Sequence, residues 1–282
     1  MRFEFDEDAI KKFLDNYDHM SPTMIREFVG CGMKTYFKRI LGMRTQPGVL
    51  LYVGTAAHAA AEENRCERME TGEWLSVEDA KGVAATVFDA KVSKEQPEFG
   101  EGQDKGSCLD LAVAHAEMHA KELAPCFEPT HIEQPFELEV EELSVPVTGY
   151  IDVIGVDEHD QVIVRDFKTT GRKMPIKETD LIDNPQFGLY AMAVEKATGK
   201  PVNVGAEVSH YRKLKTKTDH VAYDVESGDV QHLKDRAPAQ ALTVDRSLRA
   251  GVYPPSPPNS FLCSEKYCDY HKGAGGPCPF GR

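Results

Sequence analysis

Two short apolar segments joined by a polar turn constrain the fold of this chain more than any other feature of the sequence. The first runs from Val145 to Val156 and the second from Val162 to Lys168. Apolar segments of this length favour β-strands, and the four residues between them, Asp157 to Asp160, have the composition of a hairpin turn. The sequence therefore predicts two neighbouring antiparallel strands here.

The predicted hairpin carries side chains that suit phosphodiester hydrolysis. Asp152 lies in the first strand, and Asp166 and Lys168 lie two residues apart in the second, so these two project from one face. Hydrolysis needs an activated water, a charge sink at phosphorus and help for the leaving oxygen, and divalent ions held by carboxylates can supply all three. Magnesium prefers a few oxygen ligands, and a lysine beside the phosphate can stabilise developing charge.

The acid-x-Lys triplet is weak evidence when taken alone. The chain has 46 acidic residues and repeats the triplet at Asp79-Ala80-Lys81. That second copy falls in a helical segment, where residues two apart diverge. The strand context therefore distinguishes Asp166 and Lys168.

The other periodic segments predict an α/β fold, with a central mixed β-sheet flanked by helices. Further strands are expected after Pro135, at Val202 to Tyr211 and near His220 to Tyr223. Helices are expected at Ser21 to Ile40, Gly54 to Met69, Thr179 to Lys196 and Ser227 to Ala250. We expect one domain over residues 1–282, with a helical insertion at 72–130 and a cysteine-bearing tail at 251–282.

The net charge of −13 indicates that the protein does not coat DNA through bulk electrostatics. Any nucleic-acid contact must therefore be local. Three basic clusters are candidates, although each is equally typical of a solvated surface: Lys34, Lys38, Arg39 and Arg44; Arg172 and Lys173; and Arg212, Lys213, Lys215 and Lys217. The acidic start and interrupted apolar stretches predict a soluble cytoplasmic protein without a membrane segment.

Three of the seven cysteines, Cys263, Cys268 and Cys278, crowd the last twenty residues. An odd number of cysteines without an export signal argues against a disulfide framework and favours a metal or cluster site. Three thiols need a fourth ligand for a tetrahedral or cuboidal site. Zinc with His271 as a ligand, and three free surface thiols, are the alternatives.

Taken in order along the chain, these residues resemble the PD-(D/E)XK nuclease superfamily, in its RecB-like branch that includes the CRISPR-associated exonucleases. In that branch a Gly-x-x-x-His-x-x-x-Glu helix precedes a Gly-x-x-Asp strand, an Asp-x-Lys strand and a Gln-x-x-x-Tyr helix. The matching residues are Gly54, His58 and Glu62; Gly149 and Asp152; Asp166 and Lys168; and Gln186 and Tyr190.

The resemblance implies a restriction-endonuclease-like core with a metal site and a catalytic lysine. The implied ligands of Mg²⁺ or Mn²⁺ are His58, Asp152, Asp166 and the Phe167 carbonyl. Lys168 would be catalytic, and Gln186 and Tyr190 would position DNA or Lys168. Plainer interpretations stay open for three residues: His58 as a packed or solvated side chain, Glu62 as a structural ion-pair partner, and Tyr190 as a core residue.

The resemblance also implies a four-iron, four-sulfur cluster held by Cys31, Cys263, Cys268 and Cys278. Such a cluster would pack the tail on the N-terminal helix and stabilise the fold as a structural metal does. The last three cysteines, with four and nine residues between them, are spaced more widely than in the family pattern. Zinc therefore stays the main alternative.

Together these features predict a metal-dependent DNA exonuclease that acts at a free end or on a single strand, in recombination, repair or phage DNA processing. A phage-encoded enzyme would act in the host cytoplasm, and a homo-oligomer is compatible with the sequence. One alternative is a catalytically idle DNA-end-binding or scaffold protein, although inactive members generally lose the carboxylates or the lysine that this chain keeps. Another is a metalloenzyme acting on a substrate other than DNA, which the acidic net charge favours mildly.

Overall fold

The protein is represented by a computed structural model that describes residues 3–157, 159–172, 174–213, 218–257 and 259–281. Its helical segments are α1 (Glu7–Leu14), α2 (Pro22–Gly30), α3 (Gly32–Thr35), η1 (Tyr36–Ile40), α4 (Leu50–Thr71), α5 (Val77–Glu95), α6 (Lys105–Met118), η2 (His119–Leu123), η3 (Ala124–Cys126), α7 (Glu178–Ile182), α8 (Pro185–Thr198), α9 (Val230–Arg249) and η4 (Lys272–Ala274). Its strands are β1 (Glu128–Leu138), β2 (Val147–Val156), β3 (Val162–Thr170), β4 (Val202–Lys213) and β5 (Thr218–Glu226).

The five strands form one mixed sheet in the order β1-β2-β3-β4-β5. Strands β1, β2 and β3 form an antiparallel meander, β4 runs parallel to β3, and β5 returns antiparallel to β4. Helices α7 and α8 supply the crossover that a parallel pair needs. This topology confirms the expected mixed sheet flanked by helices, including the antiparallel pairing of the hairpin.

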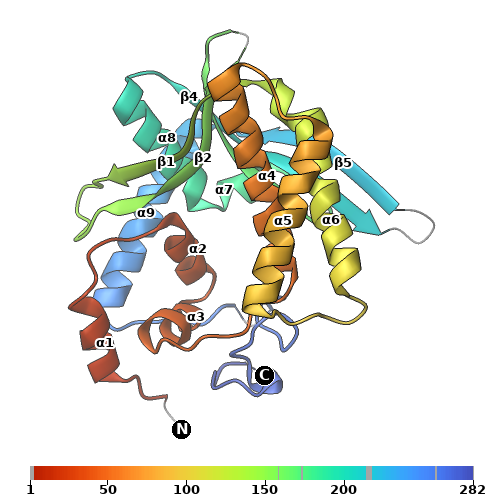
Figure 1. Ribbon diagram of the computed structural model, residues 1–282. Helices are drawn as coiled ribbons and strands as arrows, with labels where there is room; N and C mark the ends of the chain where they lie inside the picture. Colours follow the sequence, from red (N-terminus) through yellow and green to blue (C-terminus); the bar gives the residue numbers. More distant parts are fainter. Residues whose placement is uncertain (1–2, 158, 173, 214–217, 258, 282) are drawn as a thin grey trace.

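Helices cover both faces of the sheet, with α4 to α6 at the right of Figure 1 and α8 and α9 at the left. On β3, Val164 packs with the α8 side chains, whereas Phe167 packs with two alanines of α4. Successive strand residues point to opposite faces, so α4 and α8 approach the sheet from opposite sides. Gly188 lets α8 lie close to α9, because a Cβ there would meet the Leu233 carbonyl oxygen at 2.2 Å.

The expected helix from Ser21 to Ile40 is wrong, because the chain breaks at Cys31. Cys31 is extended, with φ −168° and ψ 104°, and separates α2 from α3. Two glycines flank it, and glycine weakens a helix interior. A Cβ at Gly32 would also meet Pro254 at 2.8 Å, so the close approach of the C-terminal segment requires a glycine here.

Two other boundaries differ from the sequence-based expectation. The helix predicted over Thr179 to Lys196 is two helices, because the Asn184 side chain accepts a hydrogen bond from Gln186 N at 3.2 Å and Pro185 begins α8. Strand β1 begins at Glu128 rather than after Pro135. Its early residues lack a clear period-two alternation, which explains why the sequence did not reveal them.

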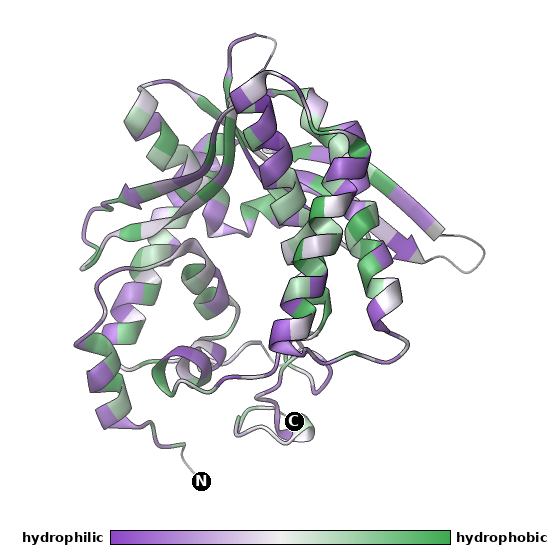
Figure 2. Cartoon of the chain, viewed as in Figure 1, coloured by the Kyte–Doolittle hydropathy of each residue, from purple (hydrophilic) through white to green (hydrophobic). Residues whose placement is uncertain are grey.

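The segment before the sheet is helical and packs largely on itself. Helices α4, α5 and α6 share a core around Phe88, which is completely buried. Figure 2 shows hydrophilic and hydrophobic residues interspersed along α5 and α6, as expected for helices with one buried face. In the described part of the chain, no helix is both long and apolar enough to cross a membrane.

Candidate active site

The candidate site lies where strands β2 and β3 separate. Their backbone pairing runs from Val156 opposite Val162 to Val153 opposite Arg165. One residue further, the Asp152 carboxylate accepts a hydrogen bond from Phe167 N at 3.1 Å. A side chain thus satisfies a backbone donor where the ladder stops, and this fixes Asp152 beside the Asp166-Phe167-Lys168 triplet.

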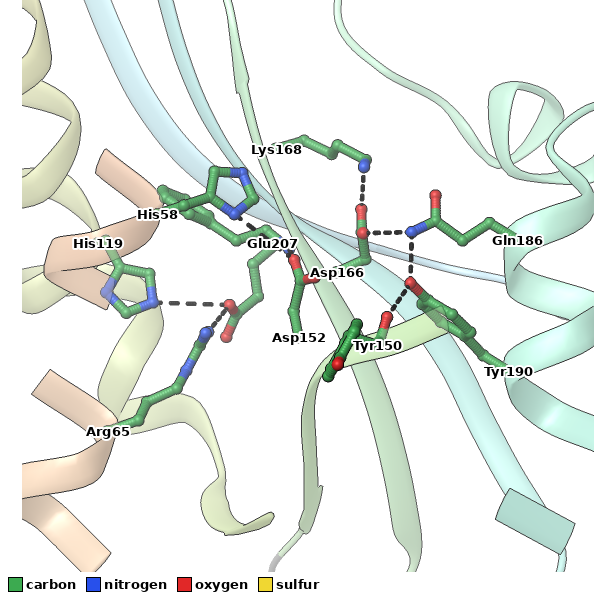
Figure 3. A network of polar contacts seen from close by, with 11 residues as sticks. His58, Arg65, His119, Tyr150, Asp152, Asp166, Lys168, Gln186, Tyr190 and Glu207 are labelled. Atoms are coloured by element: carbon green, nitrogen blue, oxygen red, sulfur yellow. Dashed lines mark hydrogen bonds and ion pairs between the residues drawn. The ribbon is translucent and has the colours of Figure 1, made fainter. Parts of the chain in front are cut away.

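A chain of polar contacts joins Asp166 to helix α8 (Figure 3). Gln186 Nε2 donates to Asp166 Oδ1 at 2.8 Å and to the Tyr190 hydroxyl at 2.7 Å. The Tyr190 hydroxyl donates in turn to the Tyr150 carbonyl oxygen at 2.6 Å. Lys168 Nζ forms an ion pair with the other oxygen of Asp166. The carboxylate of Asp166 is therefore held from two sides.

His58 approaches the same carboxylates from helix α4. Its Nδ1 lies 3.6 Å from Asp152 Oδ2, and its ring contacts the Phe167 ring with centroids 5.1 Å apart. The side chain is 39% exposed but closely surrounded by protein, and this desolvation lowers the pKa of His58 to about 4. A neutral imidazole has a free lone pair at neutral pH, as a metal ligand requires.

The electrostatics of Asp152 favour a bound cation. Burial raises the pKa of Asp152 to about 8, and the negative charge of Asp166 acts in the same direction. Asp166 Oδ2 is buried and has no hydrogen-bond partner besides its ion pair with Lys168. Two close carboxylates, Asp166 buried and Asp152 half-buried, beside a neutral imidazole form a donor set that fits a divalent ion.

The donor atoms do not surround an ion position as they stand. In the part of the chain that the structure describes, no group of three or more His, Cys, Asp or Glu side chains is arranged to hold a metal ion. Lys168 lies against one of the Asp166 oxygens. Metal binding would therefore require the side chains of Lys168 and the two aspartates to rotate.

The sequence did not reveal a buried ionic network behind Phe167. Arg65 of α4 forms an ion pair with Glu207 of β4, and His119 Nε2 lies 3.6 Å from Glu207 Oε2. Burial alone would raise the pKa of Glu207, but the Arg65 guanidinium and the contact with His119 together outweigh it and lower the pKa to about 2. One signal for this network was present in the sequence, namely Glu207 within the apolar strand that became β4. A charged side chain in such a strand needs a buried partner.

Glu133 of β1 is a second residue that the sequence did not single out. Its neighbours Ile132 and Gln134 lie opposite Val153 and Ile151, so Glu133 lies across from Asp152. Its φ of +45° is uncommon for a residue other than glycine and costs free energy. Burial and then the charge of Glu62 raise the pKa of Glu133.

The four cysteines expected to act together line a single cavity of about 590 Å³. Burial raises the pKa of Cys263, and the charges of Cys31, Cys278 and Cys268 add to the effect, which reflects their proximity. His271 lines the same cavity, and its Nδ1 accepts a hydrogen bond from Gly273 N at 3.0 Å. That contact places the proton of the neutral ring on Nε2, which is buried without a partner.

Comparisons with known proteins match the chain to one family model and to solved structures of low sequence identity. A family model described as the PD-(D/E)XK nuclease superfamily matches residues 19–272. A solved structure named "Putative exonuclease", from Eubacterium rectale, is 13% identical with a TM-score of 0.54, covers 93% of this chain and is itself covered over 93%. A second, SSO0001, is 12% identical with a TM-score of 0.41 over 98% of this chain and 96% of its own. No curated protein matches the chain.

Proposed function

The chain belongs to the PD-(D/E)XK nuclease superfamily, and from this premise we propose that it is a divalent-metal-dependent deoxyribonuclease that degrades DNA from its ends. The observation that carries the proposal is the convergence of Asp152, Asp166, Lys168 and His58 where β2 and β3 separate. The whole of residues 1–282 would act as one nuclease domain, with 72–130 as its helical insertion. The nuclease fold implies a nucleic-acid substrate, and DNA is the proposed one.

The proposed metal ligands are Asp152, Asp166, His58 and the Phe167 carbonyl, with Mg²⁺ or Mn²⁺ as the ion. A bound divalent ion supplies an acidified water and offsets negative charge on the phosphate. The carboxylates provide hard oxygen donors, and a nitrogen from His58 is a ligand that first-row transition metals accept well. Manganese is therefore expected to support activity at least as well as magnesium.

Lys168 is proposed as the residue that contacts the reacting phosphate. Its ammonium already lies beside Asp166, so a rotation of its flexible side chain would release it towards a phosphate oxygen or the attacking water. There it would donate hydrogen bonds and stabilise the negative charge that develops at phosphorus.

Gln186 and Tyr190 are proposed as positioning residues rather than groups that touch the phosphate. Gln186 fixes one oxygen of Asp166, and Tyr190 holds Gln186 by means of its own bond to the Tyr150 carbonyl. Tyr190 is 3% exposed and packs in the core, which also agrees with its plainer interpretation as a core residue. The two interpretations are compatible, because a packed ring aims its hydroxyl reproducibly.

The four cysteines are proposed to hold a four-iron, four-sulfur cluster that joins the tail, residues 251–282, to the α2–α3 junction. Their shared cavity and mutual electrostatic effects support this proposal. The observed hydrogen bond to His271 Nδ1 favours four thiolates over a zinc site that includes this histidine, since the remaining ring nitrogen carries a proton. The cluster would stabilise the fold rather than take part in hydrolysis.

The alternative of a catalytically idle DNA-end-binding or scaffold protein is less well supported. The chain keeps both aspartates, the lysine and the histidine, and their contacts bring them together. A protein selected only to bind DNA would have no use for two close carboxylates, which repel phosphate.

A cleavage assay with matched variants tests the proposed function. Purified protein would be incubated with end-labelled linear single-stranded and duplex DNA, and with circular DNA, in manganese or magnesium. We expect manganese-dependent shortening of linear DNA, no cut in circular DNA, and loss of activity in Asp166→Ala and Lys168→Ala. An inactive wild type would refute the nuclease proposal, and cleavage of circular DNA would refute the requirement for an end.

A further inference from the structure

The proposed helical insertion, residues 72–130, has no part in the proposed hydrolysis, yet one of its side chains reaches the residues of the metal site. That side chain is His119, at the start of η2. Other features that the proposed function leaves unused, namely Lys173, Lys215 and Lys217 of the basic clusters, lie outside the described residues.

Phe167 touches or adjoins every other proposed metal ligand. Its backbone N donates to Asp152 Oδ2 at 3.1 Å, and its ring contacts the His58 ring with centroids 5.1 Å apart. Its neighbours in the chain are Asp166 and Lys168, and its own carbonyl is a proposed ligand. A shift of Phe167 would therefore disturb the whole donor set.

His119 packs against the same Phe167 ring. The two ring centroids lie 4.8 Å apart with an interplanar angle of 61°, and aromatic rings attract one another in such an edge-to-face arrangement. Both side chains are buried, so the contact lies in the closely packed interior. A change in the ring of His119 must therefore be felt by Phe167.

The sheet holds His119 in turn. Phe167 and Glu207 are directly paired in the parallel ladder of β3 and β4, so their side chains project side by side from one face. His119 Nε2 lies 3.6 Å from Glu207 Oε2, and Arg65 pairs with the same oxygen. In Figure 3 His119 and Glu207 lie on the same side of the site as His58. His119 thus spans two neighbouring side chains of the sheet.

The local backbone brings the insertion onto Phe167 at a second point. The segment His119–Leu123 is a single π-helical turn, closed by a hydrogen bond from Ala124 N to the His119 carbonyl oxygen. Leu123, at the end of this turn, packs in the same buried cluster as Phe167. Such turns are rare and occur frequently at functional sites.

We propose that His119 is a positioning residue of the metal site, which holds the Phe167 ring and thereby fixes His58 and Asp152 for the divalent ion. The inference rests on the proposed nuclease function and makes the helical insertion a necessary part of the active centre. His119 touches neither the substrate nor the ion. Groups that orient metal ligands in this indirect way typically contribute about ten- to hundredfold to metal affinity.

A matched pair of substitutions separates positioning from general stability. His119→Leu removes the ring, while Glu207 still has Arg65 as its partner. His115→Leu makes the same change one helical turn earlier, at a buried ring that contacts Ser209 Oγ at 2.8 Å. His119→Phe restores an aromatic ring without the polar contact.

Manganese binding can be measured without DNA, from the EPR signal of free Mn²⁺ during a titration. We expect His119→Leu to raise the Kd for manganese about tenfold and His115→Leu to stay within about twofold of the wild type, although both variants should lower Tm in EDTA. His119→Phe should bind manganese within about threefold of the wild type, because the ring contact is kept. Cleavage of linear DNA by His119→Leu should need about tenfold more manganese for its half-maximal rate.

An unchanged manganese Kd in His119→Leu would overturn the inference. An equal loss in His115→Leu would also overturn it, because the effect would then be a general loosening of the insertion. A His119→Phe protein as weak as His119→Leu would show that the ring contact does not position the ligands.

The titration also distinguishes failure of this inference from failure of the proposed function. A wild type that binds no manganese would overturn both the role of His119 and the proposed ligand set. If the wild type binds manganese but leaves DNA intact, the nuclease proposal fails, while the manganese Kd values of the variants still decide the role of His119.

Discussion

Gln186 Nε2 lies 2.8 Å from Asp166 Oδ1 and donates a hydrogen bond to it, although the two residues belong to different elements. The same nitrogen also donates to the Tyr190 hydroxyl, so helix α8 sets the orientation of a carboxylate on strand β3. The crossover between β3 and β4 thereby contributes to the site as well as to the sheet.

Removal of this contact tests whether α8 positions Asp166. In Gln186→Met, which keeps the length of the side chain, kcat should fall about 10- to 100-fold, the equivalent of one hydrogen bond to a charged group. The unfolding temperature should change little. Steady-state kinetics at saturating manganese would measure the effect, and Tyr190→Phe should give a smaller loss. An unchanged kcat in Gln186→Met would show that Asp166 does not need this support.

The carboxylate pair should destabilise the metal-free protein. Asp152→Asn replaces a carboxyl group whose ionisation burial and the Asp166 charge both oppose, so we expect the unfolding free energy in EDTA to increase by about 1–2 kcal/mol, or roughly 2–8 °C in Tm. The wild type should gain stability from manganese, whereas the variant should gain much less. Thermal unfolding in EDTA and in manganese would measure both effects. An equal manganese shift in the two proteins would remove Asp152 from the ligand set.

Arg65 and Glu207 should matter for stability because both are buried. Arg65→Ala would leave the Glu207 carboxylate without a partner, and the expected cost is about 3–5 kcal/mol. The double variant Arg65→Met/Glu207→Met removes both charges and should recover much of that loss. Urea unfolding curves of the three proteins would give the values. A double variant less stable than Arg65→Ala would mean that the ion pair itself, and not the orphaned charge, dominates.

Acid should destabilise the fold through the buried histidines. Burial lowers the pKa of His115 to about 3 and lowers the pKa of His119. Below about pH 6.5 the unfolded chain therefore binds protons that the folded protein does not. The contribution of these two histidines to stability should be constant above that pH and fall towards pH 3, by about 1.4 kcal/mol per pH unit for each imidazole.

The matched test of this pH dependence is His115→Gln. The His115 ring accepts or donates a hydrogen bond at Ser209 Oγ at 2.8 Å, which a glutamine amide can replace. Urea unfolding at pH 7 and pH 5 should show a smaller loss in the variant than in the wild type. Equal losses in both proteins would exclude His115 as a source of the acid sensitivity.

The sequence predicted the sheet and the order of the motifs well because these depend on local patterns. The two short apolar segments and the polar turn at Asp157 were enough to place β2 and β3. The break at Cys31 was missed although two glycines flank it, and the close approach of Pro254 to Gly32 joins residues that are distant in sequence. Long-range packing of this kind leaves little trace in a local window.

The same distinction applies to the site. The spacing of Asp166 and Lys168 predicted that they share a face, and they form an ion pair. The Arg65–Glu207 contact joins residues 142 positions apart, and neither residue belongs to a motif. The left-handed backbone at Glu133 was also unpredictable, because no glycine or asparagine marks it. Contacts across the fold, and strain that the fold imposes, require the structure.

The proposed cluster makes the last prediction, which concerns Cys278. Cys278 is 8% exposed, packs in the same core as Cys31 and Cys268, and pairs with His271 through the backbone. Anaerobically purified protein should be brown, with a broad absorption band at roughly 400 nm and about four iron atoms per chain. Cys278→Ala should lose the colour and unfold at a lower temperature, while Cys126→Ala, in an exposed position, should keep both properties.

Cleavage per folded molecule should survive in Cys278→Ala, because the aspartates and the lysine are intact. A colourless wild type that contains zinc would overturn the iron–sulfur assignment, and a Cys278→Ala protein with unchanged stability would overturn the structural role of the tail.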